Sequence, residues 1–287
     1  MLPESVESNR VLSGSCVVPD LPVRTSDEPM APEHYRYIAT HAWWMGTFMT
    51  DAPDDASAAE PPPCHVHYSE HLLQQWTPAS QDADWLLDRE LTGRVTWLAG
   101  SGTAAAEAGF DLWDAWPTGR FRAPHGDFYA ELNDCAPHRP SGSWATPTPE
   151  FLALLPRDPA ALLARLREDS PEGRSYTGPF RSATDALRSC SVPADLRAAL
   201  YAALLELPAV TLADEAKDLD GNICIALVHD AGATRTELLV DPVDGQYAGE
   251  RDTLRRASTC GLTEGTVIAE TSVRTAVVDS IGALPVF

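Results

Sequence analysis

Hydrophobic and polar positions alternate along the first half of the chain in three stretches that are separated by loop-forming residues. Residues 34–49 (HYRYIATHAWWMGTFM) are rich in aromatic side chains, and residues 64–77 and 84–99 place apolar side chains on one face. Because side chains point to opposite faces in turn along a strand, this period of two predicts strands. We therefore expect an antiparallel β-meander, with residues 51–63 as a loop.

The middle of the chain has a helical pattern instead. Leu196, Leu200 and Leu204 recur at helical spacing after Pro193, which suits a first helical turn. Asp158 is followed by Pro159, and an Asp cap with a proline in the first turn is typical of a helix start. We therefore predict three helices: one that begins at Asp158, one over residues 180–187 and one over residues 193–207.

Alternation returns after Pro208, which ends the last helix. Asp220-Gly221 is a tight-turn dipeptide between two extended runs, as expected for a hairpin. The predicted strands of this part are 209–217, 222–229, 234–240, 246–252, 265–273 and 275–281. Strands, then helices, then strands again indicate an α+β fold in which helices pack on an antiparallel sheet.

The chain divides into a short leading segment and one domain. Residues 1–32 are rich in proline, serine and acids and lack periodicity, so we expect them to be flexible. The single α+β domain spans 33–287, with a β-meander half, a helical layer and C-terminal antiparallel strands. These three parts are 33–146, 147–207 and 208–287. Residues 100–109 are expected to be a loop, and residues 110–149 to be irregular with short strands.

Charge excludes some partners. The net charge is −21 and Lys217 is the only lysine, so nucleic acid and anionic lipid surfaces would repel the chain. We therefore expect no nucleic-acid partner. The sequence contains no apolar run of about 18 residues that would predict a transmembrane helix. Residues 1–20 also lack the apolar stretch of a signal peptide.

The six cysteines are spread along the chain without the close spacing of a zinc site. An even number of cysteines permits disulfides and thus an oxidising compartment. The cysteines could equally be small buried apolar residues. Both interpretations stay open, and the sequence does not specify the connectivity of Cys16, Cys64, Cys135, Cys190, Cys224 and Cys260.

Three histidines on the second predicted strand form the strongest candidate for metal chemistry. His65, His67 and His71 point to one face of a strand, and neighbouring imidazoles can bind zinc or copper. His65 and His71 lie roughly 20 Å apart along a strand, so one ion cannot bind all three histidines. A hairpin that is symmetric about its loop would place His41 opposite His71. The alternative is that the histidines form only the polar outer face of an edge hairpin.

Four tryptophans on neighbouring predicted strands are the candidate ligand-binding residues. These are Trp43, Trp76, Trp85 and Trp97, which could line an apolar concavity. Alternatively, they form the core under the helices. No G-x-S-x-G, H-E-x-x-H or glycine-rich phosphate motif occurs, so no catalytic residue is assigned.

Four segments resemble an uncharacterised actinobacterial family of membrane-anchored extracytoplasmic proteins that are associated with sigma factors. The segments are HYRYIATHAWW, PADLRAALYAALLELPAV, DLDGNICIALV, and ELLVDPVDGQYAGE with the ending TAVVDSIGALP. That family is in turn similar to the open half-barrels of LolA-like lipoprotein carriers and RseB-like sensors. The resemblance implies a curved antiparallel sheet that wraps a layer of helices around an apolar cavity, with no catalytic residues to carry over. Family members usually have a membrane helix before this domain, and we expect none within the 287 residues of this sequence.

Together these observations predict a non-enzymatic binding or sensor domain outside the cytoplasm or at the cell surface. Its ligand would be an apolar, lipid-like molecule or a protein partner, and no cofactor is expected. One alternative is a metal-dependent enzyme that uses zinc or copper on the histidine-rich strand. Another is a purely structural interaction module, which would present a flat apolar patch.

Overall fold

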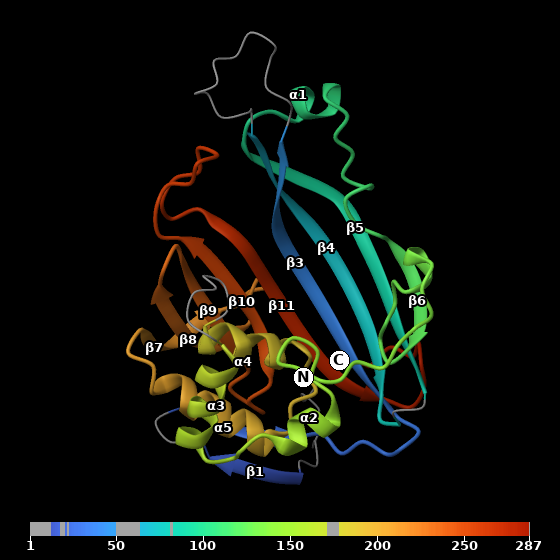
Figure 1. The fold of residues 1–287 in the computed structure, drawn as a ribbon, viewed down its shortest axis with the longest axis vertical. Coiled ribbons are helices and arrows are strands. Elements are labelled where there is room, and N and C mark those ends of the chain that lie inside the picture. The colour runs from blue at the N-terminus through green and yellow to red at the C-terminus, as the bar shows by residue number, and fades with distance from the viewer. Residues whose placement is uncertain are drawn as a thin grey trace, which may run out of the picture.

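A computed structural model describes residues 13–17, 21, 23–49, 64–80, 83–170 and 178–286. Its main feature is a curved, open antiparallel sheet of nine strands in the order β6-β5-β4-β3-β11-β10-β9-β8-β7 (Figure 1). Helices gather on one side of this sheet, and β1 and β2 form a separate pair. The expected α+β fold, with a curved antiparallel sheet and a helical layer, is confirmed.

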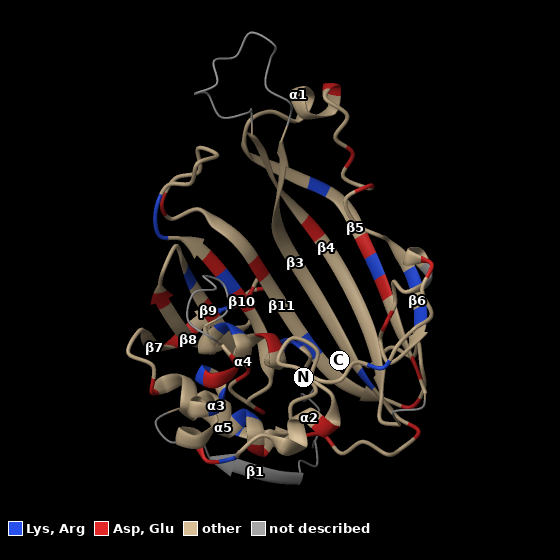
Figure 2. Ribbon diagram, in the orientation of Figure 1, with Lys and Arg blue, Asp and Glu red and all other residues tan. Residues whose placement is uncertain are grey.

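Three long strands build the first half of the sheet. They are β3 (Tyr35–Met49), β4 (Cys64–Pro78) and β5 (Asp84–Ala99), followed by the short edge strand β6 (Gly119–Pro124). The sequence predicted the three long strands to within a residue. The loop expected at 51–63 lies outside the described residues. Ion pairs join β6 to β5, where Arg120 meets Asp88 and Arg122 meets Asp84 (Figure 2).

Five strands form the second half of the sheet. They are β7 (Val210–Lys217), β8 (Ile223–Ala231), β9 (Thr234–Val240), β10 (Tyr247–Leu254) and β11 (Val267–Val278). The prediction of two strands at 265–273 and 275–281 is wrong, because β11 runs unbroken through Arg274, which pairs with Ala39. An exposed polar residue in a strand keeps the alternation going and does not end the strand. The pairing of β11 with β3 joins the two halves into one sheet.

The helices are shorter than the helical region that we expected. They are α1 (Gly102–Glu107), α2 (Pro149–Leu154), α3 (Pro159–Asp169), α4 (Pro179–Arg188) and α5 (Ala194–Leu205), with a 3-10 turn at Glu131–Asn133. The loop expected over 100–109 instead contains α1, which the Ser101 side chain caps by accepting from the backbone N–H of Ala104. Among the described residues, no helix is long and apolar enough to cross a membrane.

The main core lies between the helices and the second half of the sheet. Leu196, Leu200 and Leu204 of α5 are fully buried, which confirms the predicted apolar stripe. They belong to one apolar cluster with Leu227 of β8 and Leu238 of β9. In Figure 1 the helices α3, α4 and α5 lie together over this half, whereas the upper part of β3 and β4 extends beyond them.

Part of the leading segment also joins this core. Residues 24–27, which we expected to be flexible, form strand β2 (Arg24–Asp27) beside β1 (Ser13–Val17). Arg197 of α5 is only 1% exposed, and its Nη1 donates to Asp27 Oδ1 at 2.7 Å. Leu21 and Val23 are buried in the main apolar cluster. The segment is therefore fastened to α5 by both an ion pair and apolar contacts.

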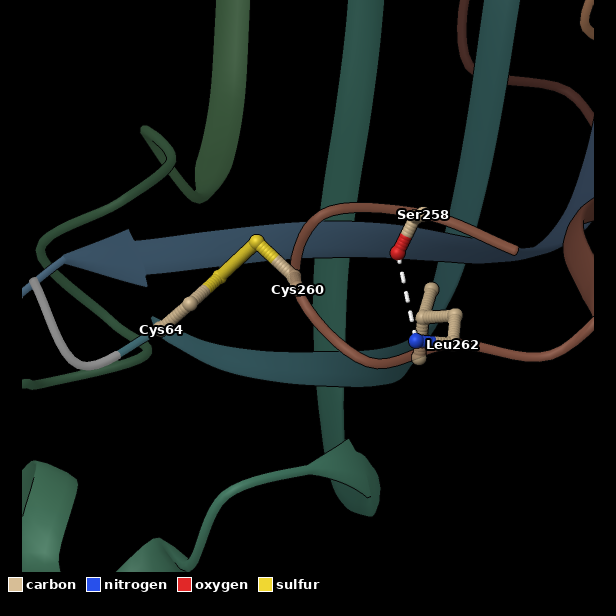
Figure 3. The surroundings of a disulfide bond; sticks show 4 residues. All are labelled: Cys64, Ser258, Cys260 and Leu262. Carbon is tan, nitrogen blue, oxygen red and sulfur yellow. Dashed lines mark hydrogen bonds between the residues drawn. A yellow bond between two sulfur atoms is a disulfide. The ribbon is translucent and has the colours of Figure 1, made fainter. Parts of the chain in front are cut away.

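One disulfide links distant parts of the chain. Cys64 at the start of β4 is bonded to Cys260 in the loop between β10 and β11, with Cα atoms 5.5 Å apart (Figure 3). In that loop the backbone N–H of Leu262 donates to Ser258 Oγ. Cys135, Cys190 and Cys224 are free, and the latter two are buried. The disulfide interpretation thus applies to Cys64 and Cys260, and the interpretation as small buried residues applies to Cys190 and Cys224.

Candidate functional site

A cavity of about 520 Å³ lies between the first half of the sheet and the segment that crosses it after β6. Its lining includes strand residues such as Arg36, Gln75 and Trp85, the 125–128 turn, residues 145–153 and the approach to α5. Ligand pockets for small molecules are typically about 300–1,000 Å³. The exposed lining is more apolar than polar. This cavity is the candidate functional site.

A strained turn shapes one wall of the cavity. His125 has a φ of 60° and Gly126 a φ of 75°, both in the left-handed region. A Cβ on Gly126 would lie 2.9 Å from the indole ring of Trp85, so only glycine fits against that ring. A histidine in this backbone region costs about 1–3 kcal/mol, and such strain is common at functional sites.

The opposite wall comes from helix α2 and the residues before it. Thr148 caps α2 by accepting from the backbone N–H of Phe151, and Pro149 fits the first turn. This places Leu152 and Ala153 on the cavity wall, while Leu154 points to solvent and is 85% exposed. Local capping therefore decides which residues of this short helix face the cavity.

The structure separates the four candidate tryptophans. Strand register places Trp43 and Trp76 on the side of the sheet away from the helices, and Trp85 and Trp97 on the helix-facing side. Trp76 is 1% exposed and packs on Tyr37. Trp43 packs on Tyr68. Of the four, Trp85 lines the 520 Å³ cavity.

Trp97 lies near the other end of the helix-facing side, in an aromatic cluster with the histidines. His67 packs on Trp97 and Phe110, with ring centroids 5.8 and 5.0 Å apart, respectively. His65 also contacts Trp97 and accepts from the backbone N–H of Ser101. A second hollow of about 440 Å³ lies beside this cluster, and two aspartates, Asp111 and Asp114, are among its lining residues.

The three histidines of β4 share one face, as the sequence predicted, but they are packed among aromatic rings. His71 lies 4.8 Å from the ring of Trp44, and its Nε2 is 3.0 Å from Ser69 Oγ. Burial, together with the charges of Arg89 and His67, lowers the pKa of His71 to about 4. Burial also lowers the pKa of His67. In the described residues, no group of three or more His, Cys, Asp or Glu could hold a metal ion.

His41 does not lie opposite His71. The register pairs His41 with Leu72, and Ala42 with His71, so the symmetric-hairpin prediction is off by one residue. A shift of one residue moves a side chain to the other face of the sheet. The His41 ring therefore lies away from the other three histidines.

Instead, His41 bridges two carboxylates. Its Nδ1 is 2.7 Å from Asp220 Oδ1 and its Nε2 is 3.1 Å from Glu70 Oε1. Burial alone would lower the pKa of His41, but hydrogen bonds and charge from Asp220 and Glu70 outweigh it and raise that pKa. A protonated imidazole can donate to both carboxylates at once. This contact holds the turn between β7 and β8 against β3 and β4.

The site residues that sequence reasoning missed are the arginines of the cavity. Arg36, Arg139 and Arg157 all line it, yet no motif marks them. Composition does not mark them either, because residues 34–50, 91–106 and 136–149 all lack Asp and Glu, and the stretch 91–106 contributes no residue to the cavity.

Comparison with known proteins adds no assignment. A scan of protein-family models, a search of curated proteins and a search of solved structures each found no match. The function must therefore be argued from the cavity and its surroundings.

Proposed function

We propose that this protein is a non-enzymatic binding protein that holds an apolar small molecule in the 520 Å³ cavity. The observation that carries the proposal is the cavity itself, which has a largely apolar lining between the sheet and a cover of irregular chain. Trp85, Phe128 and Leu152 offer apolar surface to such a ligand. Pockets of this kind, with a few convergent polar groups, are the usual form of a small-molecule site.

The disulfide supports a role outside the cytoplasm. Disulfides form and persist in oxidising compartments. Cys64 and Cys260 are bonded across the ends of different strands, where they join β4 to the loop between β10 and β11. A carrier or sensor that works at the cell surface is consistent with this bond.

The alternative of a metal-dependent enzyme has less support. His65, His67 and His71 are enclosed by aromatic rings, and the carboxylates that bind His41 lie on the other side of the sheet. A catalytic metal site usually needs three protein ligands around one ion. The described histidines of β4 do not converge in this way.

The test is native mass spectrometry of protein purified without chelator, followed by titration with the fluorescent apolar probe N-phenyl-1-naphthylamine. We expect a small bound mass that is lost on denaturation, or saturable probe binding. Ala153→Trp should fill the cavity and weaken probe binding at least tenfold, because Ala153 lines it.

Leu154→Trp is the matched control, because Leu154 is the next residue of the same helix, is 85% exposed and does not line the cavity. It should change probe binding less than twofold. Equal binding by both variants and the parent protein would show that the cavity is not the binding site.

A further inference from the structure

The charged residues that line the cavity are positive, whereas the chain as a whole is negative. The chain has 42 acidic and 21 basic residues, and its net charge is −21. Yet the described residues that line the cavity include three arginines and no Asp or Glu. From this reversal we infer that the ligand is an amphipathic organic anion, an alkyl or aryl chain with one carboxylate or phosphate group, and that Arg36 binds the acid. This inference rests on the binding function proposed above.

Two of the three arginines already have partners. Arg139 forms an ion pair with Glu150. Arg157 Nε donates to Asp195 Oδ2 at 3.0 Å, and its Nη1 donates to the backbone oxygens of Leu152 and Leu155. These arginines fasten the cover of the cavity to α2 and α5. Their charge is largely committed to the protein itself.

Arg36 differs from them. It is half-buried on β3 and lines the cavity, but it forms no ion pair with any carboxylate that the structure describes. A half-buried guanidinium without a carboxylate loses hydration and gains no ion pair in return. An acid group from a ligand would supply that partner. Arginine suits this role because its planar fork binds carboxylate or phosphate through two parallel hydrogen bonds.

A second donor lies beside Arg36. Thr77 of β4 pairs directly with Arg36 in the sheet, so both side chains lie on the same face. Gln75 Nε2 donates to Thr77 Oγ1 at 3.1 Å, which leaves the hydroxyl proton of Thr77 free to donate. Arg36, Gln75 and Thr77 all line the cavity. A carboxylate or phosphate oxygen, which only accepts, matches this pair of donors.

The rest of the lining suits an apolar body. The indole of Trp85 and the side chains of Phe128 and Leu152 also line the cavity. An ion without an apolar part would leave this surface without a partner, and a neutral apolar molecule would leave Arg36 without one. The amphipathic anion satisfies both parts of the lining.

The experiment compares ligands that share one chain and differ in the head group: dodecanoate, dodecyl phosphate, dodecanol and dodecyltrimethylammonium. Each is titrated below its critical micelle concentration by competition with N-phenyl-1-naphthylamine and by calorimetry. We expect both anions to bind at least tenfold more tightly than dodecanol, and the cation to bind most weakly. Dodecanoate and dodecyl phosphate distinguish a carboxylate from a phosphate head group.

Arg36→Gln should weaken binding of the anions by about 10- to 100-fold, which is the range for the loss of a hydrogen bond to a charged group. The same variant should change dodecanol binding less than threefold. Arg120→Gln is the control, because Arg120 is an exposed arginine on β6 that is paired with Asp88 and does not line the cavity. The inference is overturned if dodecanol binds as tightly as the anions and if Arg36→Gln changes the affinity for neither kind of ligand. If Ala153→Trp still abolishes probe binding in that case, the proposed function is retained. If no ligand competes with the probe and Ala153→Trp has no effect, both the inference and the proposed function fail.

Discussion

Replacing Arg197 with methionine should destabilise the fold more than any loss of a surface ion pair. Arg197 is 1% exposed, and its guanidinium joins three separate parts of the chain. It donates to Asp27 of β2, to the backbone oxygen of Val192 before α5 and to that of Gly245 in the turn before β10. It also donates to the backbone oxygens of Ser26 and Asp244. All of these acceptors lose their charged donor in Arg197→Met.

The magnitude follows from burial. Removing one partner of a buried ion pair typically costs about 3–5 kcal/mol, because the other charge and its hydrogen-bonding groups stay without a partner. Asp27 keeps one contact, since it also accepts from the backbone N–H of Ala194, so we expect the lower half of this range. Methionine has a helix propensity close to that of arginine, so helix α5 itself is little affected. For a chain of this size, the loss corresponds to a decrease in Tm of about 2–4 °C per kcal/mol.

The assay is urea unfolding followed by circular dichroism and tryptophan fluorescence, with a thermal melt as a second measurement. Arg120→Gln serves as the reference, because the Arg120–Asp88 pair has side chains 61% and 33% exposed. Exposed pairs of this kind contribute about 0–1 kcal/mol. If Arg197→Met loses no more free energy of unfolding than Arg120→Gln, the interpretation of Arg197 as a buried anchor is refuted.

Three further predictions concern the disulfide, a buried histidine and the turn at the cavity. Replacing Cys64 and Cys260 with serine should lower the free energy of unfolding by up to about 5 kcal/mol in the chain-entropy model, since the bond spans 196 residues. A reductant should lower the Tm of the parent protein but not the Tm of this variant. The low pKa of His71 means that the unfolded chain binds the extra proton between about pH 6.5 and 4, so stability falls as pH falls through that window. The free energy of unfolding of His71→Gln, measured at several pH values, should therefore fall less on acidification than that of the parent protein, by at most about 3 kcal/mol. Parallel pH profiles of the two proteins would contradict the low pKa of His71. Gly126→Ala should reduce both stability and probe binding, because its Cβ would strike Trp85 from a left-handed backbone; unchanged binding would show that this turn does not shape the site.

Local patterns predicted the fold well where a strand or helix carries its own periodicity. The alternation along β3, β4 and β5 gave their bounds, and the leucine spacing of α5 gave its buried face. The division of β11 into two strands at residue 274 failed, because the ladder with β3 runs unbroken through Arg274. Whether a strand is continuous depends on its neighbours, and the strand that pairs with β11 at Arg274 is β3, from the far end of the chain.

The candidate site was harder to predict, because it depends on register and on contacts between distant segments. Placing His41 opposite His71 assumed a symmetric hairpin, and a shift of one residue put His41 on the other face, beside Asp220. The same alternation splits Trp43 from Trp97. Arg36 lies in an ordinary strand pattern, and only the fold shows that it lines a cavity and forms no ion pair with any described carboxylate.

The position of the cavity follows from how the helices are distributed over the sheet. Helices α3, α4 and α5 pack closely on the second half, where Leu162, Leu166 and Leu200 are fully buried. Among the described residues, no such helical layer covers the first half, and the chain from His125 to α2 crosses its lower part instead. Proline-rich irregular chain cannot interlock with a sheet as regularly spaced helical side chains do, because it lacks a repeating apolar face. A space therefore remains between cover and sheet, and the half of the sheet that α3, α4 and α5 leave uncovered is the half that contains the cavity.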